Sequence, residues 1–156
     1  FKALSEVHPF ARLTLVGKGS ETCPVPADIA RLVRRLGYVS HERLVELYHS
    51  CRALVLLSDF EAFGLPIAEA LCTGLPVIIN RQSHTADIFQ GLPGVYTVEN
   101  RNVGDFRYIA AKLLEARLNR RNIAHAAAER FAIHRTYGRK KERYMALLNG
   151  ARKPIR

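Results

Sequence analysis

The sequence lacks the features that mark several broad classes of protein. No apolar run approaches the roughly 20 residues that a membrane-spanning helix needs. There is no internal repeat and no low-complexity tract among the 156 residues. The three cysteines, Cys23, Cys51 and Cys72, do not have the spacing of metal ligands and cannot all pair with one another. Cys51 and Cys72 stand in apolar contexts, so we expect buried thiols and a reducing, cytoplasmic location.

What is present is the composition of one globular domain. A chain of 156 residues, 48% of them hydrophobic, is long enough to bury a core without disulfides or a bound metal. No signal peptide is visible at Phe1 and there is no initial Met. We therefore expect the chain to be a piece of a longer protein.

The net charge of +10 is concentrated toward the C-terminus. Residues 1–100 contain 9 Lys and Arg against 10 Asp and Glu, whereas residues 101–156 contain 15 against 4. The excess is densest at residues 135–143. A basic helical face is either a solvated surface or an attraction for an anionic partner. No nucleic-acid motif accompanies the charge, so among partners we expect an anionic membrane surface, at its inner face, or an acidic protein rather than nucleic acid.

Hydrophobic runs and turn signals alternate along the chain in the manner of an α/β protein. The alternation predicts a Rossmann-like parallel sheet with helices on both faces. The expected strands are residues 12–16, 34–36, 53–57, 77–79 and 95–98. The expected helices are residues 1–7, 27–33, 42–51 and 66–73, with further helix from 103 onward that breaks near 118–121 and 133–136.

Ligands of such sheets bind beyond the carboxyl ends of the strands. The segments that fall at these ends are Gly17, Gly37, Ser58 to Gly64, and Asn80 to Thr85. We therefore expect these segments to meet at one rim and form a single cleft.

The most informative segment runs from Glu61 to Leu71, with the sequence EAFGLPIAEAL. It follows an apolar strand and places Pro66 where the first position of a helix tolerates a missing N–H. A strand, a glycine turn and a helix N-terminus form an anion site, because free N–H groups and the helix dipole point the same way. Gly64 suits a turn with a positive φ or a close phosphate, and an ordinary tight turn is the alternative. Glu61 and Glu69 are spaced to hold a polar ligand from two sides.

This pattern resembles the signature of the retaining glycosyltransferases of the GT-B fold, in the glycosyl transferases group 1 family. The signature has two Glu residues separated by seven positions, in a setting like Glu-Gly-Phe-Gly-Leu-Pro-x-x-Glu-Ala. Ala62 stands here in place of the usual Gly. The matching residues are Glu61, Phe63, Gly64, Leu65, Pro66, Glu69 and Ala70. Weaker matches extend the resemblance from about Leu13 to Leu148.

The resemblance implies a C-terminal, donor-binding domain truncated at its N-terminus. Residues 1–133 would bind the nucleotide sugar, and residues 134–156 would form a basic helix and tail. Glu69 is implied to accept hydrogen bonds from the two ribose hydroxyls, which the paired oxygens of a carboxylate suit. Tyr38 and Val39 match the turn that borders the nucleobase in relatives.

The same resemblance assigns the sugar and phosphate contacts. It places Glu61 at the catalytic centre, as a contact to hydroxyls of the donor sugar and not as a nucleophile. Phe63, Gly64 and Leu65 would present main-chain groups to the sugar, with the Phe63 side chain also available for core packing. Gly17 and Lys18 lie where a phosphate or base approaches, although a solvated turn lysine is an equal reading of Lys18.

The sequence departs from the family pattern at a loop and at one further position. Ser83 and His84 occupy a loop where many relatives have two glycines, so they either reshape the sugar–phosphate pocket or form an altered loop. Arg52 replaces a common Asp, which we expect to affect local structure more than chemistry. Relatives also carry an upstream strand with a cationic loop and an N-terminal acceptor domain.

The implied reaction moves a sugar from a nucleotide diphosphate sugar, of the UDP or GDP type, to an acceptor hydroxyl with retention of configuration. No metal or other cofactor is expected. We expect this chain alone to be inactive, because the acceptor half of the cleft lies in the missing N-terminal domain. The alternative is a non-catalytic module that binds nucleotide sugars, since the same Gly64 and Glu69 features would serve it.

Overall fold

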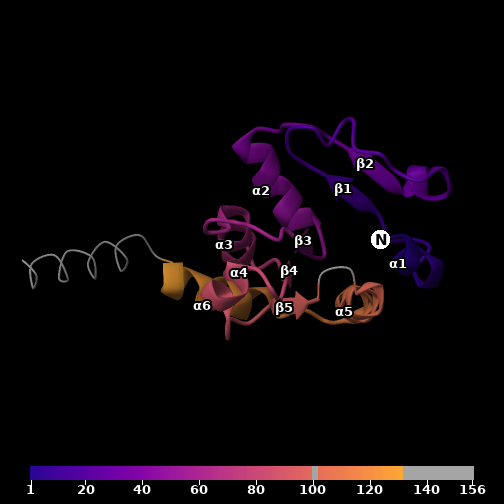
Figure 1. The fold of residues 1–156 in the computed structure, drawn as a ribbon. Helices are drawn as coiled ribbons and strands as arrows, with labels where there is room; N and C mark the ends of the chain where they lie inside the picture. The colour runs from indigo at the N-terminus through magenta and orange to yellow at the C-terminus, as the bar shows by residue number, and fades with distance from the viewer. Residues whose placement is uncertain (100–101, 132–156) are drawn as a thin grey trace, which may run out of the picture.

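The computed structural model describes residues 1–99 and 102–131, and Figure 1 shows how their helices and strands are arranged. The predicted alternation of strands and helices is confirmed. In chain order the elements are α1 (Lys2–Val7), β1 (Leu13–Leu15), the 3-10 helix η1 (Ala27–Leu32), β2 (Val33–Arg35), α2 (His41–Ser50), β3 (Leu54–Leu56), α3 (Leu65–Cys72), β4 (Val77–Asn80), α4 (His84–Phe89), β5 (Val95–Val98), α5 (Val103–Glu115) and α6 (Arg120–Phe131).

All strand pairs are parallel, as predicted. Within the described residues they form two ladders, β1–β2 and β3–β4–β5, and no ladder joins β1 to β3. Helix α3 connects β3 to β4 and α4 connects β4 to β5, which is the crossover that parallel neighbours require. The α/β Rossmann-like architecture is therefore confirmed, with its hydrogen bonding interrupted between the two ladders.

The central strand β4 carries the core on both of its faces. Val77 and Ile79 pack into a cluster with residues of α2, α3, α4 and α6, while Ile78 packs into a second cluster with residues of α1 and α5. All four residues of β4 are buried. Side chains of a strand alternate between its faces, so one strand serves both clusters. The helices thus lie on both faces of this sheet, as expected.

The structure refines three local predictions. Residues 27–32 form a helix, as expected, and this helix is of the 3-10 type. Residues 84–89 form the helix α4, whose first residue was predicted to lie in a loop. This short helix buries only Thr85 and Phe89. Pro66 is the second residue of α3, because Gly64 is the N-cap.

The cysteines differ from expectation at one position. Cys72 is exposed, because it ends α3 on the side that also carries Glu69 rather than on the side facing the core. Cys51 is partly buried and Cys23 is exposed. Among the described helices none has the length and apolarity to cross a bilayer, the longest being α5 with 13 residues.

Arginine side chains close several helix ends by donating to carbonyl oxygens. Arg52 donates to the carbonyls of Leu113, Leu114 and Ala116 at the end of α5. Arg130 donates to carbonyls of Ile88 and Gln90 at the end of α4. A cation at a helix C-terminus also meets the negative end of the helix dipole. Arg52 thus has a structural contact. Arg130, which belongs to the basic C-terminal third, also stabilises the fold. The densest basic stretch, 135–143, and the expected boundary at 133 lie outside the described residues.

Candidate functional site

The sequence motif forms the start of α3, just beyond the carboxyl end of β3. Gly64 is the N-cap of α3 and has φ 81° and ψ 49°, in the left-handed region that favours glycine. A Cβ at this position would lie 2.8 Å from Ile67 Cδ1, 3.2 Å from Thr85 Cγ2 and 3.3 Å from Phe89 Cε2. The expected positive φ is confirmed, and close packing adds a second reason for glycine.

The half-buried Glu61 sits against the first turn of this helix. Its Oε1 accepts a hydrogen bond from the Gly64 N–H at 3.3 Å. The positive end of the helix dipole favours a carboxylate there. The Gly64 N–H is one of the groups expected to bind an anionic ligand, and in the free chain it is bonded to Glu61. The Leu65 N–H, at the first position of α3, belongs to the group of N–H donors that a helix start leaves without an intrahelical acceptor.

The second acid of the motif has a partner on a different helix. The hydroxyl of Tyr48, on α2, donates to Glu69 Oε2 at 3.2 Å. Tyr48 is 4% exposed, and burial together with the neighbouring Glu69 carboxylate raises the pKa of its phenol. The sequence motifs gave Tyr48 no part in the site. A tyrosine on a core-facing stripe is the sole sequence signal for this contact, because its polar tip needs a partner when buried.

The aromatic residue of the motif packs against the body of the protein. The Phe63 ring centroid lies 6.0 Å from that of Phe89 and 6.1 Å from that of Phe131, and the latter two lie 5.2 Å apart. The Phe63 side chain therefore takes part in an aromatic cluster. Phe63 nevertheless stays 42% exposed, and its neighbour Leu65 is 63% exposed.

The other predicted site residues gather at the ends of β1 and β2. The Gly17 N–H donates to the Gly37 carbonyl at 2.8 Å, and the Gly37 N–H donates to Ser20 Oγ at 2.9 Å. These bonds join the turn containing Lys18 to the turn containing Tyr38. Lys18 is exposed, and Tyr38 is 84% exposed. The structure thus assembles two groups, one at each ladder, both at the carboxyl ends of their strands.

A buried polar network, which sequence analysis missed, fixes the motif loop. Asn80, at the end of β4 and 1% exposed, donates from Nδ2 to Asp59 Oδ1 at 3.1 Å and accepts the Gln82 N–H at 3.0 Å. Ser83 donates to the Asn80 carbonyl at 2.9 Å, and its Oγ lies 2.6 Å from Thr85 Oγ1. Satisfied buried networks of this kind rigidify a loop. Ser83 therefore has structural contacts within this loop.

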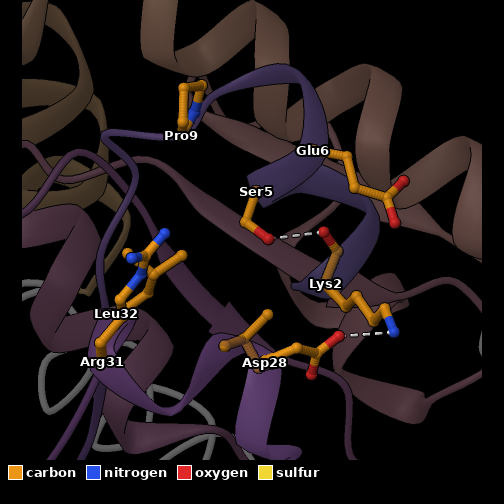
Figure 2. A pocket seen from close by; sticks show the side chains of 8 residues that line it. Lys2, Ser5, Glu6, Pro9, Asp28, Arg31 and Leu32 are labelled. Carbon is orange, nitrogen blue, oxygen red and sulfur yellow. Dashed lines mark hydrogen bonds and ion pairs between the residues drawn. The ribbon is translucent and has the colours of Figure 1, made fainter.

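Two hollows are found on the described surface. One, of about 200 Å³, lies between α1 and η1, where Lys2 Nζ pairs with Asp28 Oδ2 at 2.6 Å (Figure 2). The other, of about 400 Å³, is lined by Arg81, Asp87 and Thr97 among others. Neither is lined by Glu61 or Glu69. In the part of the chain that the structure describes, no three His, Cys, Asp or Glu residues gather as a metal site.

Comparison with solved structures identifies the fold. HepE from Anabaena in complex with UDP-glucose superposes with a TM-score of 0.69 at 21% identity, covering 83% of this chain and 39% of HepE. AviGT4, a glycosyltransferase involved in avilamycin A biosynthesis, superposes with a TM-score of 0.62 at 21% identity, covering 92% and 46%. At this level of identity the likeness concerns the fold.

Sequence comparison identifies the family. N-acetyl-alpha-D-glucosaminyl L-malate synthase of Bacillus anthracis is 31% identical over 134 residues, which cover 82% of this chain and 34% of that protein. O-antigen chain mannosyltransferase B of Escherichia coli is 41% identical over 56 residues, which cover 36% and 15%. The chain thus spans about a third or less of the length of these relatives. The profile of the family Glycosyl transferases group 1 matches residues 1–130, and the chain belongs to that family.

Proposed function

We propose that this chain is the donor-binding part of a retaining glycosyltransferase of the GT-B type. The observation that carries the proposal is the arrangement of the motif: Glu61 bonds the Gly64 N–H at the start of α3, and Glu69 on the same helix is held by Tyr48. Both acids follow a buried parallel sheet at the end where ligands of α/β folds bind. The bound UDP-glucose of HepE supports a nucleotide sugar of the UDP type, and a GDP sugar is the alternative.

In this proposal the two acids bind different parts of the donor. Glu69 accepts the two ribose hydroxyls through its paired oxygens. Tyr38 and Val39 border the nucleobase, and Gly17 and Lys18 lie beside the phosphates. Glu61 accepts sugar hydroxyls, and Phe63, Gly64 and Leu65 offer main-chain groups to the same sugar. Because Glu61 holds the Gly64 N–H in the free chain, the donor must share or replace that contact.

The proposed chemistry is substitution at the anomeric carbon with retention. The bond between that carbon and the diphosphate oxygen breaks, and the acceptor hydroxyl forms the new bond on the same face. The acceptor proton passes to an oxygen of the departing diphosphate. The N-terminus of α3 stabilises the negative charge that develops there. Glu61 orients the sugar and forms no covalent bond. The acceptor site belongs to another part of the parent protein, so the isolated chain should not turn over.

Calorimetric titration with UDP-glucose, GDP-mannose and ADP-glucose tests donor binding. Wild-type chain should bind one of the three, and Glu69→Ala should weaken that binding at least about tenfold. Glu46→Ala, which removes an acid paired with Arg43 on the surface of α2, is the matched control and should bind as wild type. Failure of all three donors to bind would contradict the proposal. Sugar transfer by the isolated chain would contradict the prediction that this chain alone is inactive.

The non-catalytic module is the competing proposal, and the same titration serves both. The parent protein separates them, because only a glycosyltransferase releases UDP or GDP in the presence of an acceptor. Peripheral attachment to an anionic cytoplasmic membrane surface also remains a proposal, supported by the positive charge of residues 101–156. Sedimentation with anionic vesicles should pull down the chain at low salt and release it at high salt. Equal binding to neutral vesicles would contradict it.

A further inference from the structure

Tyr48 holds one oxygen of the motif acid Glu69 in place. Its hydroxyl donates to Oε2 at 3.2 Å, from a ring that is 4% exposed. The ring belongs to the hydrophobic cluster that also contains Ile67 and Leu71 of α3. A side chain packed in this way has little rotameric freedom. The hydroxyl therefore fixes the orientation of the carboxylate and leaves Oε1 available to other donors.

A second residue fixes Tyr48 itself. The Arg120 guanidinium donates to the carbonyl of Tyr48 at 2.6 Å and to that of His49 at 2.9 Å, near the end of α2. It also donates to the carbonyl of Gly74, just after α3, at 3.3 Å. One guanidinium thus ties together the ends of the two helices that carry Tyr48 and Glu69. Arg120 belongs to α6, so its contacts join α6, α2 and the end of α3. These contacts set the position of the phenol relative to the carboxylate.

We propose that Tyr48 is a positioning residue for ribose recognition. It acts through Glu69, by holding one carboxylate oxygen so that the other faces the ribose hydroxyls of the donor. The inference rests on the proposed donor-binding function and adds to it the residue that gives Glu69 its orientation. The consequence is selectivity for a ribose over a deoxyribose, because a mobile carboxylate makes a weaker bond to the 2′-hydroxyl.

A purely structural role for Tyr48 makes a different prediction. A buried phenol needs a hydrogen-bond partner, and Glu69 would then serve only to satisfy it. Removing the hydroxyl would change stability, but it would leave the ratio of affinities for ribose and deoxyribose nucleotides unchanged. That ratio is therefore the measurement that separates the two roles.

The experiment titrates UDP and 2′-deoxy-UDP into wild-type chain, Tyr48→Phe and the control Tyr108→Phe. Tyr108 lies on α5 and is 61% exposed. Wild type and Tyr108→Phe should prefer UDP by about tenfold. Tyr48→Phe, which keeps the ring, should reduce the preference to about threefold or less.

An unchanged preference in Tyr48→Phe would overturn the inference and leave the proposed function standing. Failure of wild type to bind UDP, GDP and ADP alike would overturn both. If it binds GDP or ADP only, the same comparison uses that nucleotide and its 2′-deoxy form. If Tyr48→Phe does not fold, carbon NMR of wild-type chain labelled at the tyrosine Cζ provides the test. UDP should shift the Tyr48 signal more than 2′-deoxy-UDP does at saturation, and equal shifts would overturn the inference.

Discussion

The Glu61 carboxylate accepts a hydrogen bond from the backbone N–H of Gly64 at 3.3 Å. The first acid of the motif is thus bonded to the residue at which the helix of the second acid, Glu69, begins. In the free chain Glu61 therefore has a structural contact in addition to its proposed role toward the sugar. Substitutions at this position should change stability as well as binding.

Glu61→Ala should lower the free energy of unfolding by about 1 kcal/mol, the usual net effect of losing one hydrogen bond. Glu61→Gln retains an acceptor oxygen and should lose less, although it no longer carries the charge that favours the helix dipole. Urea unfolding of the two variants and wild type measures the difference. An unchanged unfolding free energy in Glu61→Ala would show that the Gly64 contact contributes nothing.

Gly64→Ala should destabilise the fold by about 2 kcal/mol, through both its positive φ and the crowding of the new Cβ. Gly91 offers a matched control, because its φ of +78° is similar and a Cβ there would meet nothing within 4 Å. Gly91→Ala should therefore cost only the backbone strain, about 1 kcal/mol. Thermal unfolding that ranks Gly91→Ala as the worse variant would contradict the packing around Gly64.

Arg120→Met should lower the free energy of unfolding by about 2 kcal/mol, since it leaves carbonyls at the ends of α2 and α3 without their charged donor. The same variant should weaken UDP binding, because Tyr48 loses the contact that fixes its position beside Glu69. Arg121→Met, at the exposed neighbouring position, should stay within about 0.5 kcal/mol of wild type. Equal effects of the two substitutions on unfolding would contradict a structural role of Arg120.

Tyr48 should make the stability of the chain sensitive to alkaline pH. Burial and the Glu69 carboxylate raise its pKa above the ordinary value of 10.0, so folding favours the protonated phenol. This contribution is complete below pH about 10, where the unfolded chain begins to ionise, and is lost as pH rises toward the folded-state pKa.

Ultraviolet difference titration follows the ionisation of the six tyrosines. One of them should ionise later than the others, or only as the chain unfolds, and Tyr48→Phe should remove that late step. Loss of an early-titrating tyrosine in Tyr48→Phe would contradict the environment assigned to the phenol.

Local sequence was sufficient for much of the fold. The apolar run at 53–57 and the turn at Gly64 predicted β3 and the start of α3, because strand burial and glycine conformation depend on near neighbours in the chain. The helix break at 118–121 also agrees with the gap between α5 and α6. The short α4 was missed, because six residues give little helical periodicity to detect.

The parts of the site that sequence did not predict depend on contacts between distant residues. Tyr48 and Glu69 are 21 positions apart, as are Asp59 and Asn80, and only the packing of separate elements brings each pair together. The interruption between β1 and β3 is likewise a property of strand pairing and not of either strand. The exposure of Cys72 depends on which side of α3 meets the core.

The most direct test of donor binding is nitrogen–proton NMR of the labelled chain during titration with UDP-glucose. We expect the largest shifts of backbone signals at Gly64 and Leu65, at Glu69, and in the turns at Gly17 and Gly37. Signals of Ser5 and Asp28, in the hollow of Figure 2, should remain unchanged. Shifts confined to that hollow, or no shifts at saturating UDP-glucose, GDP-mannose or ADP-glucose, would contradict donor binding at the motif.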